Sequence, residues 1–162
     1  MVQKEEYRFL VDFMLGRLAR WLRIFSYDTV YANEQNRATL LLQSLQENRV
    51  IITRDHRLSQ KRAWKLILIK SDHLGEQLQQ LVEETNISIS RERLFTRCTI
   101  CNVSTEKLLN KKEIMDSVPE YVYQTQGEFS RCPQCGRIYW PGTHWELLLR
   151  DLGKAGIKVS EK

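Results

Sequence analysis

Residues 7–25 read YRFLVDFMLGRLARWLRIF, and the hydrophobic pattern of this stretch changes at Asp12. Residues 7–11 form a short apolar run of strand length, which Asp12 ends. Beyond it, apolar residues recur at intervals of three and four, as on one face of a helix: Leu15, Leu18, Leu22 and Phe25. A strand followed at once by an amphipathic helix predicts the first unit of an α/β fold.

The same alternation continues through residue 82. Further strands are predicted at residues 50–53 (VIIT) and 66–69 (LILI), with a weaker one at residues 29–32 (TVYA). The helices between and after them are marked by two leucine-rich stripes: Leu41, Leu42 and Leu45, then Leu74, Leu78, Leu81 and Val82. Alternating strands and helices require right-handed crossovers between parallel strands. The predicted fold class is α/β, a parallel sheet with helices on both faces.

The pattern changes again near residue 90, where short polar stretches with Pro and Gly replace the periodic segments. We therefore predict an α/β domain over residues 1–90 and a second, smaller module over residues 91–152. Residues 145–152 (WELLLRDL) predict a short helix at the end of that module. Residues 153–162 are predicted to be a flexible basic tail.

The only four cysteines of the chain form two C-x-x-C pairs, Cys98 with Cys101 and Cys132 with Cys135. Such paired knuckles predict one structural zinc ion in a closed tetrahedral shell of four thiolates. Gly136 follows the second pair and would supply the positive φ that a knuckle turn needs. Two disulfides, or one redox-active pair, remain as alternatives, but neither explains the paired arrangement.

Acidic residues follow three of the predicted strands: Asp12, Asp55 and Asp72. Ligands of an open α/β sheet bind at the carboxyl ends of the strands, so these side chains are expected to converge there. Clustered carboxylates repel one another unless a cation neutralises them, and their oxygens suit Mg²⁺ or Mn²⁺. The alternative is that each Asp only caps the helix that follows it, most plainly so for Asp72.

A second feature of the first helix is basic. Arg17, Arg20 and Arg23 recur every three residues opposite the leucine stripe, close to Asp12. Arginine favours bidentate contacts with phosphate, so this face is suited to a nucleic-acid backbone. A solvated helix face without a ligand is the alternative.

Composition excludes few classes of function. The net charge of +5 is compatible with a polyanionic partner but does not require one. No apolar stretch approaches the roughly 18 residues needed to cross a bilayer, so we expect no membrane partner. Zinc-binding thiolates need a reducing compartment, and the first residues lack the features of a signal peptide, so a cytoplasmic location is expected.

Several segments together resemble the Mut-seven-type C-terminal RNase family. The matching segments run in order over residues 7 to about 150: FLVD at 9–12, MLGRLARWLR at 14–23, YDT at 27–29, TRD at 53–55, QL at 77–78, RCTICN at 97–102 and CPQCGRIYWPGTHW at 132–145. The resemblance implies a PIN-like α/β nuclease domain followed by a zinc ribbon. It also implies hydrolysis of RNA phosphodiester bonds with Mg²⁺ or Mn²⁺ held by strand-end carboxylates.

Carried over to this sequence, the resemblance makes Asp12 and Asp55 the catalytic metal ligands, with Glu34 or Asp72 positioning a second ion or the attacking water. Arg54 would help Arg17 and Arg20 to hold phosphates. This chain departs from the family after the second strand, where acids are usual but residues 33–37 read NEQNR. If Asn36 takes the place of an acid, ion affinity and activity should fall, because an amide contributes no charge.

The second module adds basic and aromatic candidates for RNA contacts: Arg137, Tyr139, Trp140 and His144. The alternative is that the aromatic residues pack around the knuckles, because so small a module has little other core. For the whole chain, the alternative function is a non-catalytic RNA-binding or ribosome-associated protein on a degenerate PIN-like fold. A toxin-like ribonuclease held by a protein partner has no sequence feature of its own here.

Overall fold

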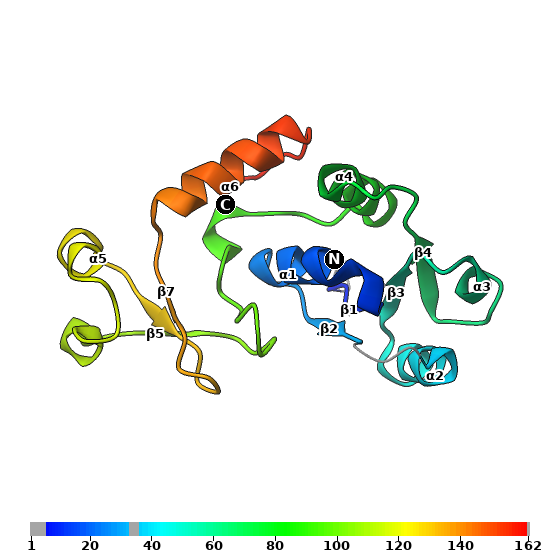
Figure 1. Cartoon of the computed structure of the whole chain (residues 1–162), viewed down its shortest axis with the longest axis horizontal. Helices are drawn as coiled ribbons and strands as arrows, with labels where there is room; N and C mark the ends of the chain where they lie inside the picture. Colours follow the sequence, from blue (N-terminus) through cyan, green and yellow to red (C-terminus); the bar gives the residue numbers. More distant parts are fainter. Residues whose placement is uncertain (1–5, 33–35, 162) are drawn as a thin grey trace, which may run out of the picture.

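The structure is a computed structural model that describes residues 6–32 and 36–161. Its elements run in the following order: β1 (Phe9–Val11), the 3-10 helix η1 (Phe13–Leu15), α1 (Gly16–Ile24), β2 (Thr29–Tyr31), α2 (Arg37–Glu47), β3 (Val50–Thr53), α3 (His56–Ser59), β4 (Lys65–Leu68), α4 (Leu74–Thr85), η2 (Arg91–Arg93), β5 (Glu106–Lys107), η3 (Lys111–Ile114), α5 (Glu120–Thr125), β6 (Ser130–Arg131), β7 (Ile138–Tyr139) and α6 (Thr143–Lys154) (Figure 1).

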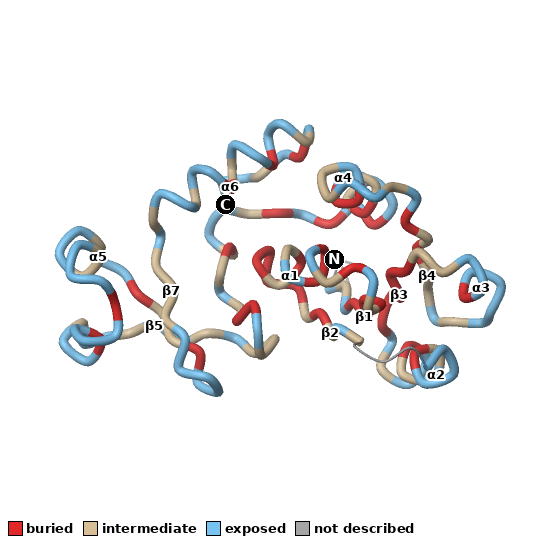
Figure 2. The backbone as a smooth tube through the Cα atoms, viewed as in Figure 1, coloured by how far each residue is buried: buried red, intermediate tan, exposed pale blue. Residues whose placement is uncertain are grey.

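The first half of the chain forms a parallel sheet in the order β2-β1-β3-β4, which confirms the predicted α/β class. Both central strands are buried at every residue, as Figure 2 shows. Strands covered on both faces need apolar residues on both sides, so the runs FLV and VIIT show no polar alternation. The predicted strands of this half form within two residues of their expected ends, and the three predicted helices form at their leucine stripes. The short helix α3 was not predicted.

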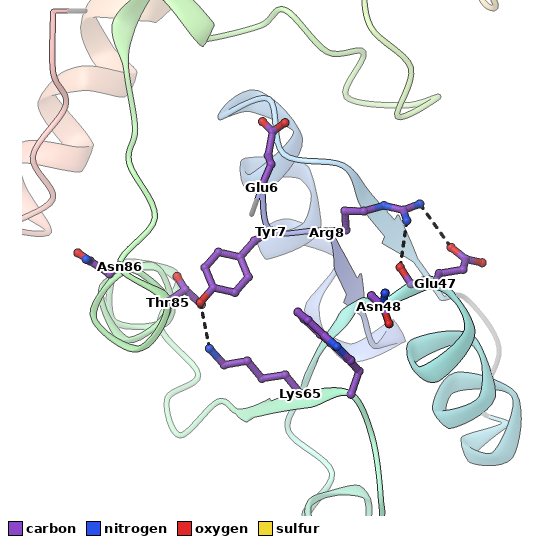
Figure 3. A pocket seen from close by; sticks show the side chains of 9 residues that line it. Glu6, Tyr7, Arg8, Glu47, Asn48, Lys65, Thr85 and Asn86 are labelled. Atoms are coloured by element: carbon purple, nitrogen blue, oxygen red, sulfur yellow. Dashed lines mark hydrogen bonds and ion pairs between the residues drawn. The ribbon is translucent and has the colours of Figure 1, made fainter. Parts of the chain in front are cut away.

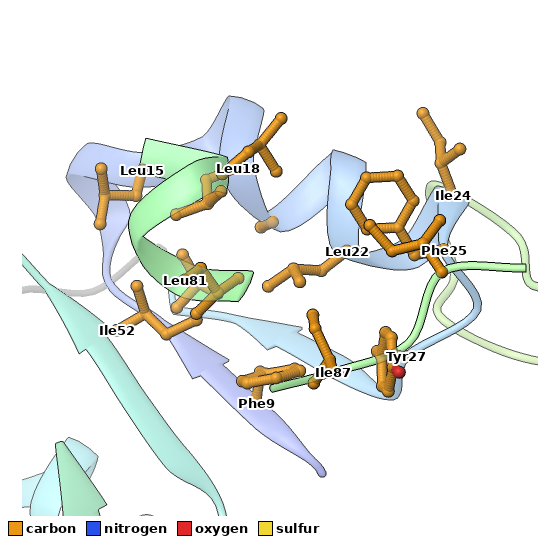
Figure 4. Packing of buried hydrophobic residues seen from close by; sticks show 14 of the residues in the cluster. Phe9, Leu15, Leu18, Leu22, Ile24, Phe25, Tyr27, Ile52, Leu81 and Ile87 are labelled. Carbon is orange, nitrogen blue, oxygen red and sulfur yellow. The ribbon is translucent and has the colours of Figure 1, made fainter. Parts of the chain in front are cut away.

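Helices α1 and α4 cover one face of the sheet, and the core lies between them and the strands (Figure 4). Leu18 and Leu22 of α1 and Leu81 of α4 are fully buried there against Phe9 and Ile52. On the opposite face, α2 and α3 contribute Leu40 and Leu58, which pack with Leu10 and Ile51. Successive residues of a strand point to opposite faces, so β1 and β3 each supply both cores.

The second half forms a small antiparallel sheet in the order β5-β6-β7, and its four cysteines lie close together. The segment between the cysteine pairs contains β5, η3 and α5, and it has a small core of its own. That core is built from Ile114, Val118 and Phe129. The cysteine cluster and the short strands confirm the predicted zinc-ribbon type of module.

The C-terminal segment differs from the flexible tail predicted for residues 153–162. Helix α6 places Leu148 and Leu152 in the same core as α1 and α4, and Ile157 is 5% exposed. The chain then runs beside residues 87–91, where the Ser160 N–H donates to the Ile89 carbonyl at 2.9 Å. The few apolar residues of this basic stretch show no helical or strand periodicity, so the sequence did not predict their burial. Only the folded structure shows that Ile157 packs in the core.

The two halves are joined by the side chain of Asp28, which follows α1. Arg49, only 6% exposed, donates to both carboxylate oxygens of Asp28 at 2.9 and 3.0 Å. From the second half, the Asn102 side chain donates to Asp28 at 2.8 Å and accepts from the Thr29 N–H at 2.9 Å. Burial opposes ionisation of Asp28, but these hydrogen bonds outweigh it and lower its pKa to about 2.

We predict that Asp28→Asn destabilises the protein at neutral pH by about 2 kcal/mol, because the buried Arg49 then keeps only Glu47 of its two carboxylate partners. The folded-state pKa lies below the ordinary value of 3.8, so this contribution is present above that value and is lost as pH falls towards about 2. Denaturant unfolding over this pH range should show a smaller loss of stability in Asp28→Asn than in the wild type.

The matched control is Asp116→Asn, which removes the same charge from an exposed position. It should follow the wild-type curve at each pH. Equal stability of Asp28→Asn and wild type at neutral pH would show that the Asp28 cluster does not hold the two halves together.

Candidate functional site

Asp12 lies at the carboxyl end of β1, where the chain turns into η1. It is 3% exposed, and both of its carboxylate oxygens accept hydrogen bonds. Oδ1 accepts from the Phe13 N–H at 2.7 Å, and Oδ2 accepts from the Thr53 hydroxyl at 2.6 Å. A carboxylate has about four lone-pair sites, so each oxygen retains capacity for one further partner. Asp12 is therefore fixed in one orientation without being saturated.

Thr53, the last residue of β3, connects the two acids. Its hydroxyl donates to Asp12 and accepts from the Asp55 N–H at 2.9 Å. The side chain is fully buried. Sequence reasoning did not assign Thr53 a role, although it stands in the TRD segment that carries the family resemblance. Threonine is common in β-strands, so its presence at the end of β3 is no signal of a site. Its hydroxyl reaches Asp12 only because β3 pairs with β1.

Asp55 follows β3 and caps the short helix α3. Its Oδ1 accepts from the Arg57 N–H at 2.9 Å, and its Oδ2 accepts from Arg37 Nε at 2.5 Å. The Arg57 N–H, and after it the Arg37 guanidinium, hold the pKa of the Asp55 carboxyl below its ordinary value. The capping role considered from sequence is real, but it leaves the carboxylate facing a cleft.

The two acids lie on one cleft of about 490 Å³, at the carboxyl end of the sheet. Its other lining residues are three arginines and five further residues: Arg37, Arg54, Arg57, Phe13, Met14, Leu40, His56 and Leu58. The donor chemistry of Asp12 and Asp55 fits a hard cation such as Mg²⁺ or Mn²⁺. The arginines give the same cleft an affinity for phosphate.

The remaining predicted acids do not join this pair in the described part of the chain. Asp72 does not line the cleft and instead pairs with Arg54, with 74% of its side chain exposed. It lies beyond the end of the edge strand β4, in the turn before α4, so the strand does not aim it inward. Glu34 and Asn33 lie outside the described residues. Asn36 caps α2, its side-chain oxygen accepting from the N–H groups of Ala38 and Thr39.

The basic face of α1 divides into two parts. Arg17 and Arg20 are exposed, as a phosphate-binding role requires. Arg23 instead donates to three backbone carbonyls, at Thr29 (2.9 Å), Thr99 (3.0 Å) and Ile100 (2.9 Å). Since the last two belong to the first cysteine knuckle, Arg23 docks the second half onto α1. These contacts occupy the Arg23 guanidinium, so we do not propose it as an RNA contact.

The four cysteines are unbonded to one another, which leaves the disulfide alternative without support. Their Sγ atoms all lie within 4.8 Å of one another, with 3.8 Å between Cys98 and Cys135. Thiolates at about 2.3 Å from one tetrahedral ion would stand roughly 3.8 Å apart, so this arrangement fits zinc. Gly136 has the positive φ predicted for its knuckle, +73°. Among residues 6–32 and 36–161, no other group of three or more His, Cys, Asp or Glu is close enough to hold one ion.

Tyr139 belongs to the cysteine site. Its hydroxyl donates to Cys98 Sγ at 3.2 Å, and the Thr99 N–H donates to the hydroxyl at 3.1 Å. Burial raises the pKa of the Cys98 thiol, but the Cys101 N–H and the Tyr139 hydroxyl are among the donors that lower it overall, to about 6. Burial, and hydrogen bonds with the other cysteines, raise the pKa of the neighbouring Cys101 thiol to about 12, so Cys98 is the first of this pair to form a thiolate. The Tyr139 side chain thus supports the thiolate cluster.

The other candidates of the second half differ in exposure. Trp140 packs on Phe129 with ring centroids 6.2 Å apart, beside the small core of this half. His144 is exposed and touches the edge of the Trp140 ring. Arg137 is exposed beside the second knuckle. The packing alternative therefore describes Tyr139 and Trp140, whereas Arg137 and His144 face solvent.

A larger pocket, of about 720 Å³, opens at the opposite end of the sheet (Figure 3). Its charged side chains have partners inside the protein: Lys65 donates to the Tyr7 hydroxyl, and Arg8 contacts Glu47 and Asp28. None of the residues predicted to form a site lines this pocket. The smaller cleft with the two aspartates is therefore the better candidate for a functional site.

No helix in the described part of the chain is long and apolar enough to cross a membrane. Comparison with curated proteins and with solved structures found no match. A family model described as the Mut7-C RNAse domain matches residues 7–152, which include both aspartates of the cleft and all four cysteines. The chain therefore belongs to the Mut7-C RNAse domain family.

Proposed function

We propose that this protein is a metal-dependent endoribonuclease that hydrolyses phosphodiester bonds of RNA, with Asp12 and Asp55 holding Mg²⁺ or Mn²⁺. One observation carries the proposal: Asp12 and Asp55 line one cleft and are linked through the Thr53 hydroxyl, in a chain of an RNase family. A bound ion would supply a water of lowered pKa and would neutralise charge that develops on the phosphate.

The residues of the chain have separate tasks in this proposal. The buried Asp12 and the capping Asp55 hold their carboxylates in fixed orientations, which Thr53 keeps in register. Arg54 and Arg57 line the same cleft and would bind the non-bridging oxygens of the phosphate that is cut. Arg17 and Arg20 would hold the RNA backbone beyond the cleft, with Arg137 and His144 as contacts of the second half.

The reaction follows from the groups present. The oxygen of a water molecule forms a bond to phosphorus while the bond from phosphorus to the 3′ oxygen breaks. The attacking water loses a proton, the leaving 3′ oxygen takes one up and becomes a hydroxyl, and the phosphate remains on the 5′ oxygen of the downstream fragment. These products are expected by analogy with nucleases of this fold class.

A second function is favoured by the segment after β2. Asn36 serves as a helix cap, and Arg37 carries a positive charge to Asp55 where the family usually has acids. A site with this charge balance suits a protein that binds RNA, alone or on the ribosome, without cutting it. The two functions differ in whether RNA is cleaved at all.

For the cysteine cluster we propose one structural zinc ion. Its four thiolates leave no open position for a substrate, so the ion would stabilise the second half of the chain. Zinc thiolates persist in a reducing environment, so a cytoplasmic location is part of the same proposal.

We predict that Asp12→Asn and Asp55→Asn each lower ion-dependent RNA cleavage by more than about 100-fold, because each removes one negatively charged ligand. RNA binding should remain, since the arginines are unchanged. Purified proteins would be incubated with a mixed pool of single-stranded and structured RNAs in Mn²⁺, Mg²⁺ or EDTA. Wild-type protein that binds RNA with salt sensitivity but cuts none of it would establish the binding function instead.

Thr53→Val is predicted to lower cleavage by about 10- to 100-fold, because Asp12 and the Asp55 N–H both lose their partner. Thr53→Ser retains the hydroxyl and should stay near the wild-type rate. Both variants would be compared in initial rates at saturating Mn²⁺ and in thermal unfolding. If Val and Ser at this position cut equally well, the hydroxyl does not position the acids.

We predict that the purified protein contains one zinc ion per chain and that Cys132→Ser loses it. The loss should lower the thermal unfolding temperature, because the short strands β5–β7 have little core besides Ile114, Val118 and Phe129. Elemental analysis would give the zinc content. Thiol titration under denaturing conditions provides the control, since disulfides would leave no thiols to react and no zinc to detect.

A further inference from the structure

Arg37 occupies an unusual position for a cation. It is the first residue of α2, where the free N–H groups of the helix favour negative charge. Its guanidinium nevertheless reaches across the cleft to Asp55 Oδ2, at 2.5 Å from Nε. The Asn36 cap anchors this end of the helix and so sets the start of the Arg37 side chain. The ion pair with Asp55 offsets the unfavourable placement of a positive charge at the N-terminus of α2.

Arg37 and a divalent ion would compete for the same carboxylate. The Asp55 side chain is 18% exposed, and the guanidinium covers the oxygen that the Arg57 N–H leaves free. An ion on this oxygen would stand close to a second positive charge, which weakens its binding. The Arg37 side chain is 46% exposed, and an ion pair this open to water is easily separated.

A phosphate in the cleft provides a second partner for Arg37. The cleft is also lined by Arg54 and Arg57, so an RNA phosphate entering it meets three guanidinium groups. A phosphate accepts two parallel hydrogen bonds from arginine, as a carboxylate does. RNA can therefore draw Arg37 away from Asp55, and the freed carboxylate then gains affinity for the ion.

We propose that Arg37 is a latch that couples the binding of RNA to the binding of a divalent ion at Asp55. In the RNA-free protein the latch closes on Asp55 and keeps ion affinity low. RNA opens it, so the ion binds well only when a phosphate is in place. By linkage, the ion raises RNA affinity by the same factor. The inference rests on the proposed function, because it assumes that the cleft binds both ligands.

The test measures Mn²⁺ binding directly, by the paramagnetic resonance signal of free Mn²⁺. Without RNA, Arg37→Gln should bind Mn²⁺ about 10-fold more tightly than the wild type. A phosphorothioate-linked RNA, which resists hydrolysis, should raise the Mn²⁺ affinity of the wild type by a similar factor. The same RNA should have little effect on Arg37→Gln, whose latch is already absent.

Two controls separate the latch from other effects. Arg150→Gln removes one charge from another exposed arginine–carboxylate pair, on α6 and outside the cleft, and should bind Mn²⁺ as the wild type does. If it too binds more tightly, the effect is one of net charge and the latch is overturned. Asp55→Asn should bind Mn²⁺ weakly with and without RNA, because the carboxylate itself is missing.

The outcomes distinguish failure of the latch from failure of the nuclease site. If the wild type binds Mn²⁺ through Asp55 but Arg37→Gln shows neither tighter binding nor a smaller response to RNA, the latch is overturned and the ion site stands. If wild type and Asp55→Asn bind Mn²⁺ equally poorly even with RNA, there is no ion site at Asp55. In that case the latch and the metal-dependent function both fall, and the RNA-binding alternative remains.

Discussion

The parallel pairing of β1 with β3 is the constraint on which the candidate site depends. Val11 lies opposite Ile52 in this pairing, so the residues that follow the two strands lie side by side at the same edge of the sheet. The Asp12 N–H then donates to the Ile52 carbonyl, and the Thr53 hydroxyl reaches the Asp12 carboxylate. A shift of one residue would turn these side chains to the opposite face of the sheet. The burial of both strands by helices on each face makes such a shift unfavourable.

A second set of contacts joins the cysteine module to the sheet domain. Arg23 holds the first knuckle by its carbonyl groups, and Asn102, next to Cys101, reaches back to Asp28 and Thr29. Most of these contacts are hydrogen bonds to charged groups, which are stronger than those between neutral groups. The thiols of the first knuckle lie beside those of the second knuckle, and its backbone carbonyls bind Arg23 of the sheet domain. Zinc would stabilise the module, and Asp28 and Arg23 determine where it sits.

The cleft carries more positive than negative charge. It is lined by two aspartates and three arginines, and Asp55 is paired with Arg37. In the proposed latch, Arg37 must leave Asp55 before an ion can bind there. The nuclease and RNA-binding proposals differ in whether an ion then binds at Asp55 and RNA is cleaved.

The sequence by itself determined the strands and main helices of the parallel sheet domain, the cysteine pairs and the two strand-end acids of the cleft. Each of these is a local signal: a period, a spacing or a position next to a strand. Tertiary structure decided the roles of Thr53, Arg23 and Arg37, the separation of Asp72 from the cleft, and the packing of Ile157. These contacts join residues that are distant in the chain. The sequence does not show which partner a hydroxyl or guanidinium group will have. Hydrophobic periodicity directs a segment to a face of the core, whereas polar contacts are settled only when the folded chain brings donor and acceptor together.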